Sequence, residues 1–270
     1  MSKIIFSDLD GTLLNDDKQI SAGNREAIRR ATRAGHSFVI ATGRPFESAK
    51  KVSDSLGLNE DGCYIVSYNG AHVYDCYRQE VLLHRTLGRP VVEQLFALAD
   101  EAGLYIQTYQ NGEVLTKADT EELRWYVSHT NLVPMPRADV LDYLTTDPSK
   151  MIVISLNEHD RLEQFRVQQE AWSHGRCRMI FSTPKYLEIV PDGVSKQMGI
   201  HFLAGKLGVD PADTIAIGDE MNDCEMIEAA GLGVAMSNAN PDVKPIADYV
   251  TQATNNEDAI AEVIERFVPL

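Results

Sequence analysis

The sequence has 270 residues, of which 40 are acidic and 25 basic, and its formal net charge is −15. This length suits one large domain or two, and a hydrophobic content of 44% suffices for a packed core, so a disordered or fibrous chain is excluded. An acidic surface repels phosphate backbones and anionic lipids, so we expect neither nucleic acid nor a membrane as a partner.

The first part of the chain alternates short apolar runs with stretches of helical spacing. The expected elements are a strand at 3–7, a helix at 21–35, a strand at 37–41, a helix at 46–56 and a strand at 64–68. Gly35 is placed to end the first helix, and Asn69-Gly70 closes the last strand. This alternation predicts a parallel sheet.

After about Leu83 the pattern changes. The expected elements are a helix at 90–103, strands at 104–109, 114–116 and 151–156, a helix at 159–172, and paired strands at 178–182 and 186–190. The pair Asn111-Gly112 between two apolar runs is typical of a β-hairpin, and hairpins belong to antiparallel sheets. The middle of the chain therefore predicts a separate α+β unit.

The first pattern resumes near the C-terminal end. The expected elements are a helix at 195–207, a strand at 214–218, a helix at 222–230, strands at 233–236 and 249–251, and a helix at 257–267. Neither flank closes a unit alone, so we predict an α/β parallel-sheet core interrupted by an inserted α+β domain. The predicted core comprises residues 1–83 and 190–270, and the predicted insert comprises 84–189.

The lack of recognisable targeting segments and the spacing of the cysteines indicate the cellular compartment. Only three apolar residues precede Asp8, too few for a signal peptide, and no later stretch is long enough to cross a bilayer, so we expect a cytoplasmic enzyme. The four cysteines are scattered without a C-x-x-C pair, which predicts reduced thiols, and the histidines lack the spacing of a zinc site.

Two aspartates follow the first expected strand. Asp8 and Asp10 are two residues apart on an extended segment, so their carboxylates face one side at the edge of the sheet where ligands bind. Like charges this close need either a raised pKa on one member or a bound hard divalent cation. An EF-hand loop is excluded, because Leu13 replaces its turn glycine and Gln19 its bidentate glutamate. A solvated acidic turn is the alternative.

A second acidic cluster, Gly218-Asp219-Glu220-Met221-Asn222-Asp223, follows another expected strand. It should lie at the same edge of the sheet, where the two acidic strand ends can share one ion. Mg²⁺ fits, because it takes oxygen ligands and commonly bridges carboxylates to a substrate phosphate. Alternatively, Asn222 and Asp223 only cap the following helix.

The segment Ala41-Thr42-Gly43-Arg44-Pro45 ends the second expected strand. It places a hydroxyl, a glycine amide and a cation where a helix begins, which is typical of a phosphate-binding turn. A turn of this composition is also common for purely local reasons.

Lys196 lies in the first turn of the helix expected at 195–207, with Ser195 as its N-cap. A cation there opposes the helix dipole and is mildly unfavourable. Its presence is therefore accidental or serves a task such as holding a phosphate or a carboxylate.

Taken in order, these four elements resemble the motifs of the haloacid dehalogenase-like phosphatase superfamily. The resemblance rests on the first motif, D-x-D-G-T, at Asp8-Leu9-Asp10-Gly11-Thr12, the second at Thr42-Gly43, the third at Lys196, and the fourth at Gly218-Asp219 with Asn222-Asp223. The match spans the whole chain, and with its inserted cap the chain is similar to the Cof-type sugar phosphatase subfamily. The resemblance implies a Rossmann-like parallel-sheet core.

The resemblance also implies the chemistry. Asp8 would be the nucleophile that forms an aspartyl-phosphate. Asp10 would protonate the leaving alkoxide and then deprotonate the attacking water, for which we expect its pKa to be raised. Metal, lysine and amides would share the stabilisation of the transition state.

Ligand-binding roles follow from the same resemblance. The implied Mg²⁺ ligands are the Asp8 carboxylate, the Asp10 backbone carbonyl and the Asp219 carboxylate. The implied phosphate ligands are the Leu9 amide, Thr42, Gly43, Lys196 and Asn222. Asp223 would orient Lys196 or a metal-bound water. Arg44 could touch phosphate or pair with an acidic neighbour, and Glu220 could lie beside the metal ligands or be solvated.

We therefore expect a Mg²⁺-dependent phosphatase of small phosphorylated metabolites, above all sugar phosphates, that acts as a monomer or homodimer. The cap would select the substrate. Candidate contacts in the cap are Tyr109, Asn111 and Tyr186, which could equally belong to its surface or core. The rival interpretations are a phosphosugar mutase with the same nucleophile and a sensor that binds a phosphorylated metabolite without turnover.

Overall fold

The computed structural model describes residues 2–130 and 132–270, and internal contacts divide the chain into two compact units. We call the unit formed by residues up to 44, 49–83 and 195–270 the core unit, and that formed by 45–48 and 84–194 the insert unit. The sequence-predicted boundary between residues 189 and 190 falls inside strand β11 (Tyr186–Pro191). This strand stays paired to its end, where Pro191 lies opposite Cys177 of β10.

The core unit contains an eight-stranded sheet in the order β14-β13-β12-β1-β2-β3-β4-β5. The strands are β1 (Ile4–Ser7), β2 (Ser37–Ala41), β3 (Cys63–Ser67), β4 (His72–Asp75), β5 (Glu80–His84), β12 (Thr214–Gly218), β13 (Leu232–Ala235) and β14 (Tyr249–Val250). From β14 to β3 all neighbours run parallel, which confirms the predicted α/β sheet. The antiparallel strand β4 and its neighbour β5 extend the edge beyond what the sequence patterns predict.

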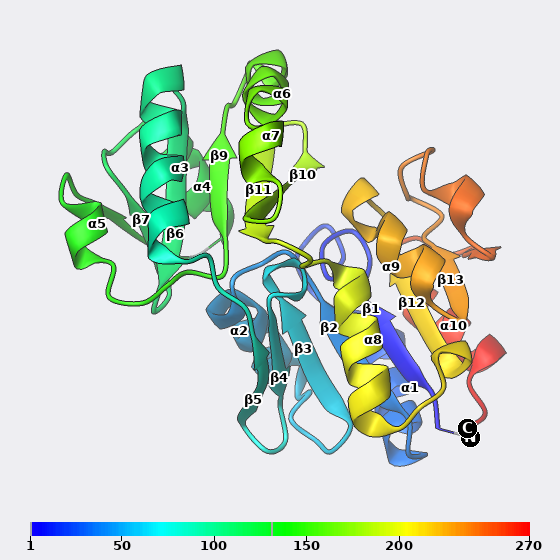
Figure 1. The fold of residues 1–270 in the computed structure, drawn as a ribbon. Coiled ribbons are helices and arrows are strands. Elements are labelled where there is room, and N and C mark those ends of the chain that lie inside the picture. The colour runs from blue at the N-terminus through cyan, green and yellow to red at the C-terminus, as the bar shows by residue number, and fades with distance from the viewer. Residues whose placement is uncertain (1, 131) are drawn as a thin grey trace. The chain divides into compact units, whose positions relative to one another are not determined.

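Helices cover both faces of this sheet. The helices are α1 (Ala22–Arg33), α2 (Phe46–Leu56), α8 (Lys196–Leu207), α9 (Cys224–Ala229) and α10 (Ala259–Phe267), with 3-10 turns η1 (Tyr68–Gly70), η2 (Pro211–Asp213), η3 (Met221–Asp223) and η4 (Lys244–Ile246). Ile200 and Leu203 of α8 and Met226 of α9 pack against Phe6 and Val66 of the sheet, and α8 lies across its strands in Figure 1. Each such buried side chain stabilises the fold by roughly 1.5–3 kcal/mol.

Two serines cap helices of the core unit, and the sequence predicted this role for Ser195. The Ser21 side chain accepts a hydrogen bond from the Asn24 N–H at the start of α1. Ser195 accepts one from the Met198 N–H at 3.2 Å and so fixes the start of α8. Capping of this kind stabilises a helix by about 1 kcal/mol.

The insert unit contains a six-stranded sheet in the order β10-β11-β9-β6-β7-β8. Its strands are β6 (Tyr105–Gln110), β7 (Glu113–Thr116), β8 (Val133–Pro136), β9 (Met151–Ile154), β10 (Cys177–Thr183) and β11. All neighbours are antiparallel except β7 and β8. Asn111 and Gly112 both have positive φ, 51° and 79°, as the predicted hairpin turn requires.

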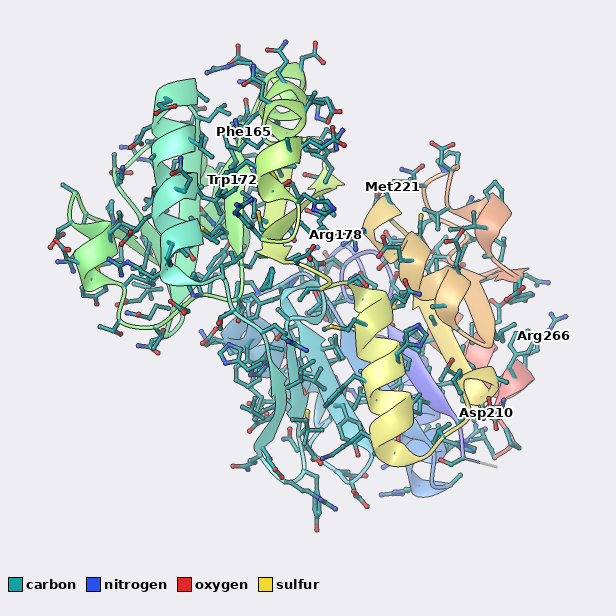
Figure 2. The ribbon with its side chains drawn as sticks, viewed as in Figure 1. Phe165, Trp172, Arg178, Asp210, Met221 and Arg266 are labelled. Atoms are coloured by element: carbon teal, nitrogen blue, oxygen red, sulfur yellow. The ribbon has the colours of Figure 1, made fainter. Side chains whose placement is uncertain are left out.

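The helices of the insert unit are α3 (Arg89–Ala102), α4 (Glu121–Thr130), α5 (Val140–Tyr143), α6 (His159–Gln168) and α7 (Glu170–Ser173). The sequence patterns did not predict α4, α5 or β8. The single helix predicted at 159–172 is instead broken at Gln169 into α6 and α7. Phe165 of α6, labelled in Figure 2, is buried in the hydrophobic core, and Trp172 of α7 packs against that core.

None of the helices in the described part of the chain is both long and apolar enough to span a membrane. All four cysteines are free thiols. Burial raises the pKa of Cys63 to about 12 and that of Cys76 to about 11, so both thiols stay protonated at neutral pH.

Candidate active site

Three parallel strands bring the predicted site residues to one edge of the core sheet. β1 lies between β2 and β12. Asp8 follows β1, Thr42 follows β2 and Asp219 follows β12, so all three emerge at the same strand ends. The Asp8 N–H also donates to the Ile217 carbonyl at 2.9 Å, which ties the first motif to the fourth.

A buried cluster of charged side chains lies at this edge. Carboxylate oxygens of Asp8, Asp219 and Asp223 lie within 4.8 Å of one another. Lys196 Nζ, from the first turn of α8, donates to Asp8 Oδ1 at 2.5 Å and to Asp223 Oδ1 at 2.6 Å. Lys196 is 2% exposed and none of the three aspartates exceeds 8%. The Lys196 ammonium group therefore bonds two of three carboxylates that have little access to water.

The pKa values of the cluster reflect this crowding. Burial raises the pKa of Asp8 well above its usual value, and Asp223 and Asp219 raise it further, although Lys196 opposes them. Burial likewise raises the pKa of Asp219 to about 7. Burial alone would lower the pKa of Lys196, but the charges of Asp223 and Asp8 outweigh it and leave the pKa above its usual value.

This donor set fits a divalent metal ion, because buried carboxylate oxygens outnumber the positive charges that balance them. Asp223 differs from the other two. Its Oδ1 accepts from Lys196, and its Oδ2 accepts from the N–H groups of Asp219 and Glu220, both at 3.1 Å. Both of its oxygens are thus used to hold the lysine and the turn after β12, so Asp8 and Asp219 are the better placed carboxylate ligands. The alternative in which Asp223 only caps the following helix is wrong, because its side chain makes no capping hydrogen bond to α9 and instead holds Lys196 and the preceding turn.

The Asp10 carboxylate points to a different set of partners. Arg44 Nε and Nη2 donate to its two oxygens at 2.7 and 2.6 Å, and Lys18 Nζ donates at 2.9 Å. Burial raises the pKa of Asp10, but these two cations outweigh it and leave the pKa below its usual value. The expected raised pKa is therefore wrong for this structure, because the side chain faces two cations. Of the two roles open to Arg44, the structure shows the pairing with an acidic neighbour.

The loop after Asp10 holds Asp219 in place. Gly11 has a φ of 80°, and a Cβ there would lie 2.3 Å from Asp219 Oδ2, so only glycine fits. The Thr12 hydroxyl donates to Asp219 Oδ1 at 2.7 Å. Asn238 Nδ2 donates to the Gly11 carbonyl at 2.8 Å. The sequence reasoning missed Thr12 and Asn238; for Thr12, its place in the first motif was an available signal, whereas Asn238 carried none.

The residues predicted to bind phosphate lie around the same strand ends. Thr42 is buried, and its Oγ1 accepts from the Arg44 N–H at 3.1 Å. Leu9 is fully buried. Asn222 is half-buried on η3, and Gly43 follows Thr42 directly. Their role as phosphate ligands stays a prediction.

The three candidate substrate contacts of the insert unit differ in burial. Tyr109 is 5% exposed, and its hydroxyl donates to the Tyr126 hydroxyl and accepts from Gln107 Nε2. Its burial favours the alternative that Tyr109 belongs to the core of the insert unit. Asn111 is exposed in the hairpin turn, and the half-buried Tyr186 accepts from Trp125 Nε1 at 3.1 Å.

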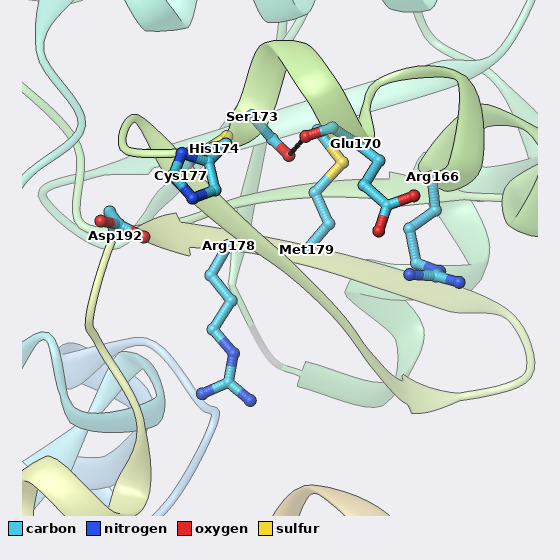
Figure 3. Close-up of a pocket in the computed structure, with 8 residues that line it drawn as sticks. All are labelled: Arg166, Glu170, Ser173, His174, Cys177, Arg178, Met179 and Asp192. Atoms are coloured by element: carbon cyan, nitrogen blue, oxygen red, sulfur yellow. Dashed lines mark hydrogen bonds between the residues drawn. The ribbon is translucent and has the colours of Figure 1, made fainter.

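A pocket of about 230 Å³ lies in the insert unit (Figure 3). It is lined by Arg166, Glu170, Ser173, His174, Cys177, Arg178, Met179 and Asp192. Its lining includes both cationic side chains, Arg166 and Arg178, and anionic ones, Glu170 and Asp192. Arg166 donates two hydrogen bonds to the Glu163 carboxylate. No predicted catalytic, metal or phosphate-binding residue lines this pocket.

The family model, the solved structures and the relatives that match this chain agree with one another. The family model described as haloacid dehalogenase-like hydrolase matches residues 5–264. A crystal structure of a haloacid dehalogenase-like hydrolase from Bacteroides thetaiotaomicron is 34% identical, with a TM-score of 0.89 over 98% of this chain and 99% of that one. The 5-amino-6-(5-phospho-D-ribitylamino)uracil phosphatase YitU of Bacillus subtilis is 32% identical over 99% of this chain and 98% of its own. Phosphatase YwpJ of the same organism is 28% identical over 98% and 100%.

Proposed function

The chain belongs to the haloacid dehalogenase-like hydrolase family and is a phosphatase, and we propose that it hydrolyses small phosphorylated metabolites, above all sugar phosphates, with Mg²⁺ and through an aspartyl-phosphate. The observation that carries this proposal is the contact of Asp8 with Lys196 inside a buried cluster that also contains Asp219. A carboxylate beside a fixed ammonium group and a metal-binding site suits attack on a phosphate ester.

In the proposed first step, an Asp8 oxygen attacks phosphorus and the bond from phosphorus to the ester oxygen breaks. The leaving alkoxide takes a proton from Asp10. In the second step, water attacks the aspartyl-phosphate, Asp10 takes its proton, and the bond between phosphorus and Asp8 breaks to release phosphate. Because the Asp10 carboxylate pairs with Arg44 and Lys18 in the structure, its proton transfers require it to turn away from these cations.

Several groups would stabilise the charge on the phosphoryl oxygens. The Lys196 ammonium, the Leu9 amide and the turn at Thr42 and Gly43 would bind these oxygens. When bound, Mg²⁺ would add positive charge there. We propose the carboxylates of Asp8 and Asp219 and the Asp10 carbonyl as its ligands.

The expected substrate class rests on the relatives. YitU is named for a substrate that carries a phosphorylated ribityl chain, and a second Bacillus subtilis relative with the same named activity is 29% identical over 98% of this chain. A phosphorylated polyhydroxy compound is therefore our first choice. We assign catalysis to the core unit and the choice of leaving group to the insert unit.

The test is a panel of phosphorylated metabolites assayed for phosphate release with Mg²⁺ and with EDTA. Asp8→Asn should abolish release, because an amide is a poor nucleophile. Asp160→Asn makes the same chemical change at an exposed position on α6 and should leave release unchanged. Equal release by wild type and Asp8→Asn, or release that EDTA does not affect, would contradict the proposal.

The intermediate can be detected directly. Acid quenching during turnover, followed by mass spectrometry of the peptide that contains Asp8, should show one added phosphoryl group. Release of phosphate without this adduct would favour direct attack by water. Activation by a sugar bisphosphate, with isomerised sugar phosphate as the product, would indicate a mutase.

A further inference from the structure

The segment Tyr68-Asn69-Gly70, which follows β3, has an unusual backbone. Its φ angles are 52°, 56° and 108°, so three consecutive residues have positive φ and two of them are not glycine. Side chains other than glycine rarely adopt this conformation, because Cβ comes close to the following carbonyl oxygen. All three residues are buried. Such a conformation persists only where surrounding contacts impose it, and it is often found near functional sites.

On one side, this segment contacts the turn predicted to bind phosphate. The Tyr68 N–H donates to the Arg44 carbonyl and the Asn69 N–H donates to the Thr42 carbonyl, both at 3.1 Å. The two bonds reach the first and last residues of Thr42-Gly43-Arg44. The position of that turn therefore depends on the backbone conformation of Tyr68 and Asn69.

On the other side, the segment contacts the start of α8. A Cβ at Gly70 would lie 2.1 Å from the Ser195 carbonyl oxygen and 3.5 Å from the Lys196 nitrogen. The neighbouring atom is backbone and cannot rotate away, so only glycine allows this approach. Ser195 caps α8, and the next residue, Lys196, reaches Asp8.

We propose that Tyr68-Asn69-Gly70 is a positioning segment, which sets the distance between the turn at Thr42 and the Lys196 ammonium group. The proposal rests on the proposed function, since both groups would bind the same phosphoryl oxygens. The segment itself touches no reacting atom in this scheme. Its effect is geometric, and a displacement of about 1 Å of a binding group can reduce a rate about 100-fold.

The main test is Gly70→Ala, which pushes the start of α8 away from the segment. We expect kcat/KM to fall by about 10- to 100-fold, and the affinity for inorganic phosphate, measured by calorimetry, to fall in parallel. Phosphate binding needs no turnover. If the wild type binds inorganic phosphate but hydrolyses no phosphate ester, the proposed function is refuted, and the effect of Gly70→Ala on phosphate affinity still tests this proposal.

Two glycines provide matched controls within the core unit. Gly35 has a φ of 89° with nothing within 4 Å of its Cβ position, so Gly35→Ala introduces backbone strain without a clash. A Cβ at Gly231 would lie 2.2 Å from the Ala212 carbonyl oxygen, so Gly231→Ala introduces a similar backbone clash away from the site. Both should lower the melting temperature and leave kcat/KM and phosphate affinity within about twofold of wild type. The same loss of affinity in all three variants, or only a lower melting temperature for Gly70→Ala, would overturn the proposal.

If Gly70→Ala does not fold, Asn69 provides a second comparison. Asn69→Gly and Asn69→Ala both remove the side-chain amide, but only glycine, which lacks Cβ, adopts positive φ without strain. A role of the backbone predicts that Asn69→Gly retains at least about fivefold more phosphate affinity and kcat/KM than Asn69→Ala. Equal losses in the two variants would show that the backbone conformation does not matter, and would refute the proposal.

Discussion

Thr12 connects the loop after β1 to Asp219, and replacing it by valine tests whether this contact supports metal binding. The Thr12 hydroxyl donates to Asp219 Oδ1 at 2.7 Å, and the side chain is fully buried. Valine has nearly the same shape but no hydroxyl, so Thr12→Val removes the hydrogen bond without opening a large cavity. A hydrogen bond to a charged group contributes about 1.5–3 kcal/mol.

Two measurements follow from this contact. At pH 8, above the pKa of about 7 of Asp219, urea unfolding in EDTA should show a loss of about 1.5–3 kcal/mol in the free energy of unfolding. The Mg²⁺ concentration for half-maximal phosphate release should rise about 10- to 100-fold, which is typical when a group that orients a metal ligand is lost.

Thr12→Ser is the matched control for both measurements, because it keeps the hydroxyl. Its Mg²⁺ requirement should stay close to that of the wild type. If Thr12→Val requires no more Mg²⁺ than Thr12→Ser, then Thr12 does not orient a metal ligand and the reasoning is refuted.

Two further predictions concern the insert unit and the response to pH. Tyr109→Phe leaves the buried hydroxyl of Tyr126 without one partner, so we expect a loss of about 1–3 kcal/mol in the free energy of unfolding with KM unchanged. A raised KM at unchanged stability would instead place Tyr109 in the substrate site. Burial raises the pKa of Glu262, but hydrogen bonds from the Tyr249 hydroxyl and the N–H groups of Ala253 and Gln252 outweigh it and lower the pKa below 4.5. A pKa that is lower in the folded state stabilises the fold above the unfolded value, and this stabilisation is lost as the pH falls through the folded value. At pH 7 the free energy of unfolding of Glu262→Gln should therefore be about 1–2 kcal/mol lower than that of the wild type, and this difference should narrow below about pH 4.5. A difference that stays constant down to pH 3 would contradict this reasoning.

The alternation of strands and helices could be predicted from the sequence, because hydrophobic periodicity reports local structure. Parallel strands expose their carboxyl ends at one edge, so the prediction that Asp8, Thr42 and Asp219 come together also needed only strand assignments. Ser195 was predictable as an N-cap for the same local reason.

Strands β4 and β5 and helices α4 and α5 were not predicted. These elements are short or weakly patterned, and their pairing with neighbours decides their structure more than their own periodicity does. The same holds for the break between α6 and α7, which no glycine or proline marks.

The orientation of individual side chains depended on tertiary contacts. The sequence places Asp10 next to another carboxylate, but Arg44, 34 residues away, and Lys18 turn it toward positive charge and lower its pKa. Tyr109 fits the alternating side-chain pattern of a strand, but its burial against Tyr126 depends on the packing of α4.

The sequence by itself determined the class of fold, the edge of the sheet where the site lies and the residue types that the site contains, since all three follow from patterns within a few residues. Only the tertiary structure decided which oxygens hold Lys196 and why residue 70 is glycine. The contact of Gly70 with Ser195 joins residues far apart in the chain, and such contacts are set by how the helix packs on the sheet, which no local pattern encodes.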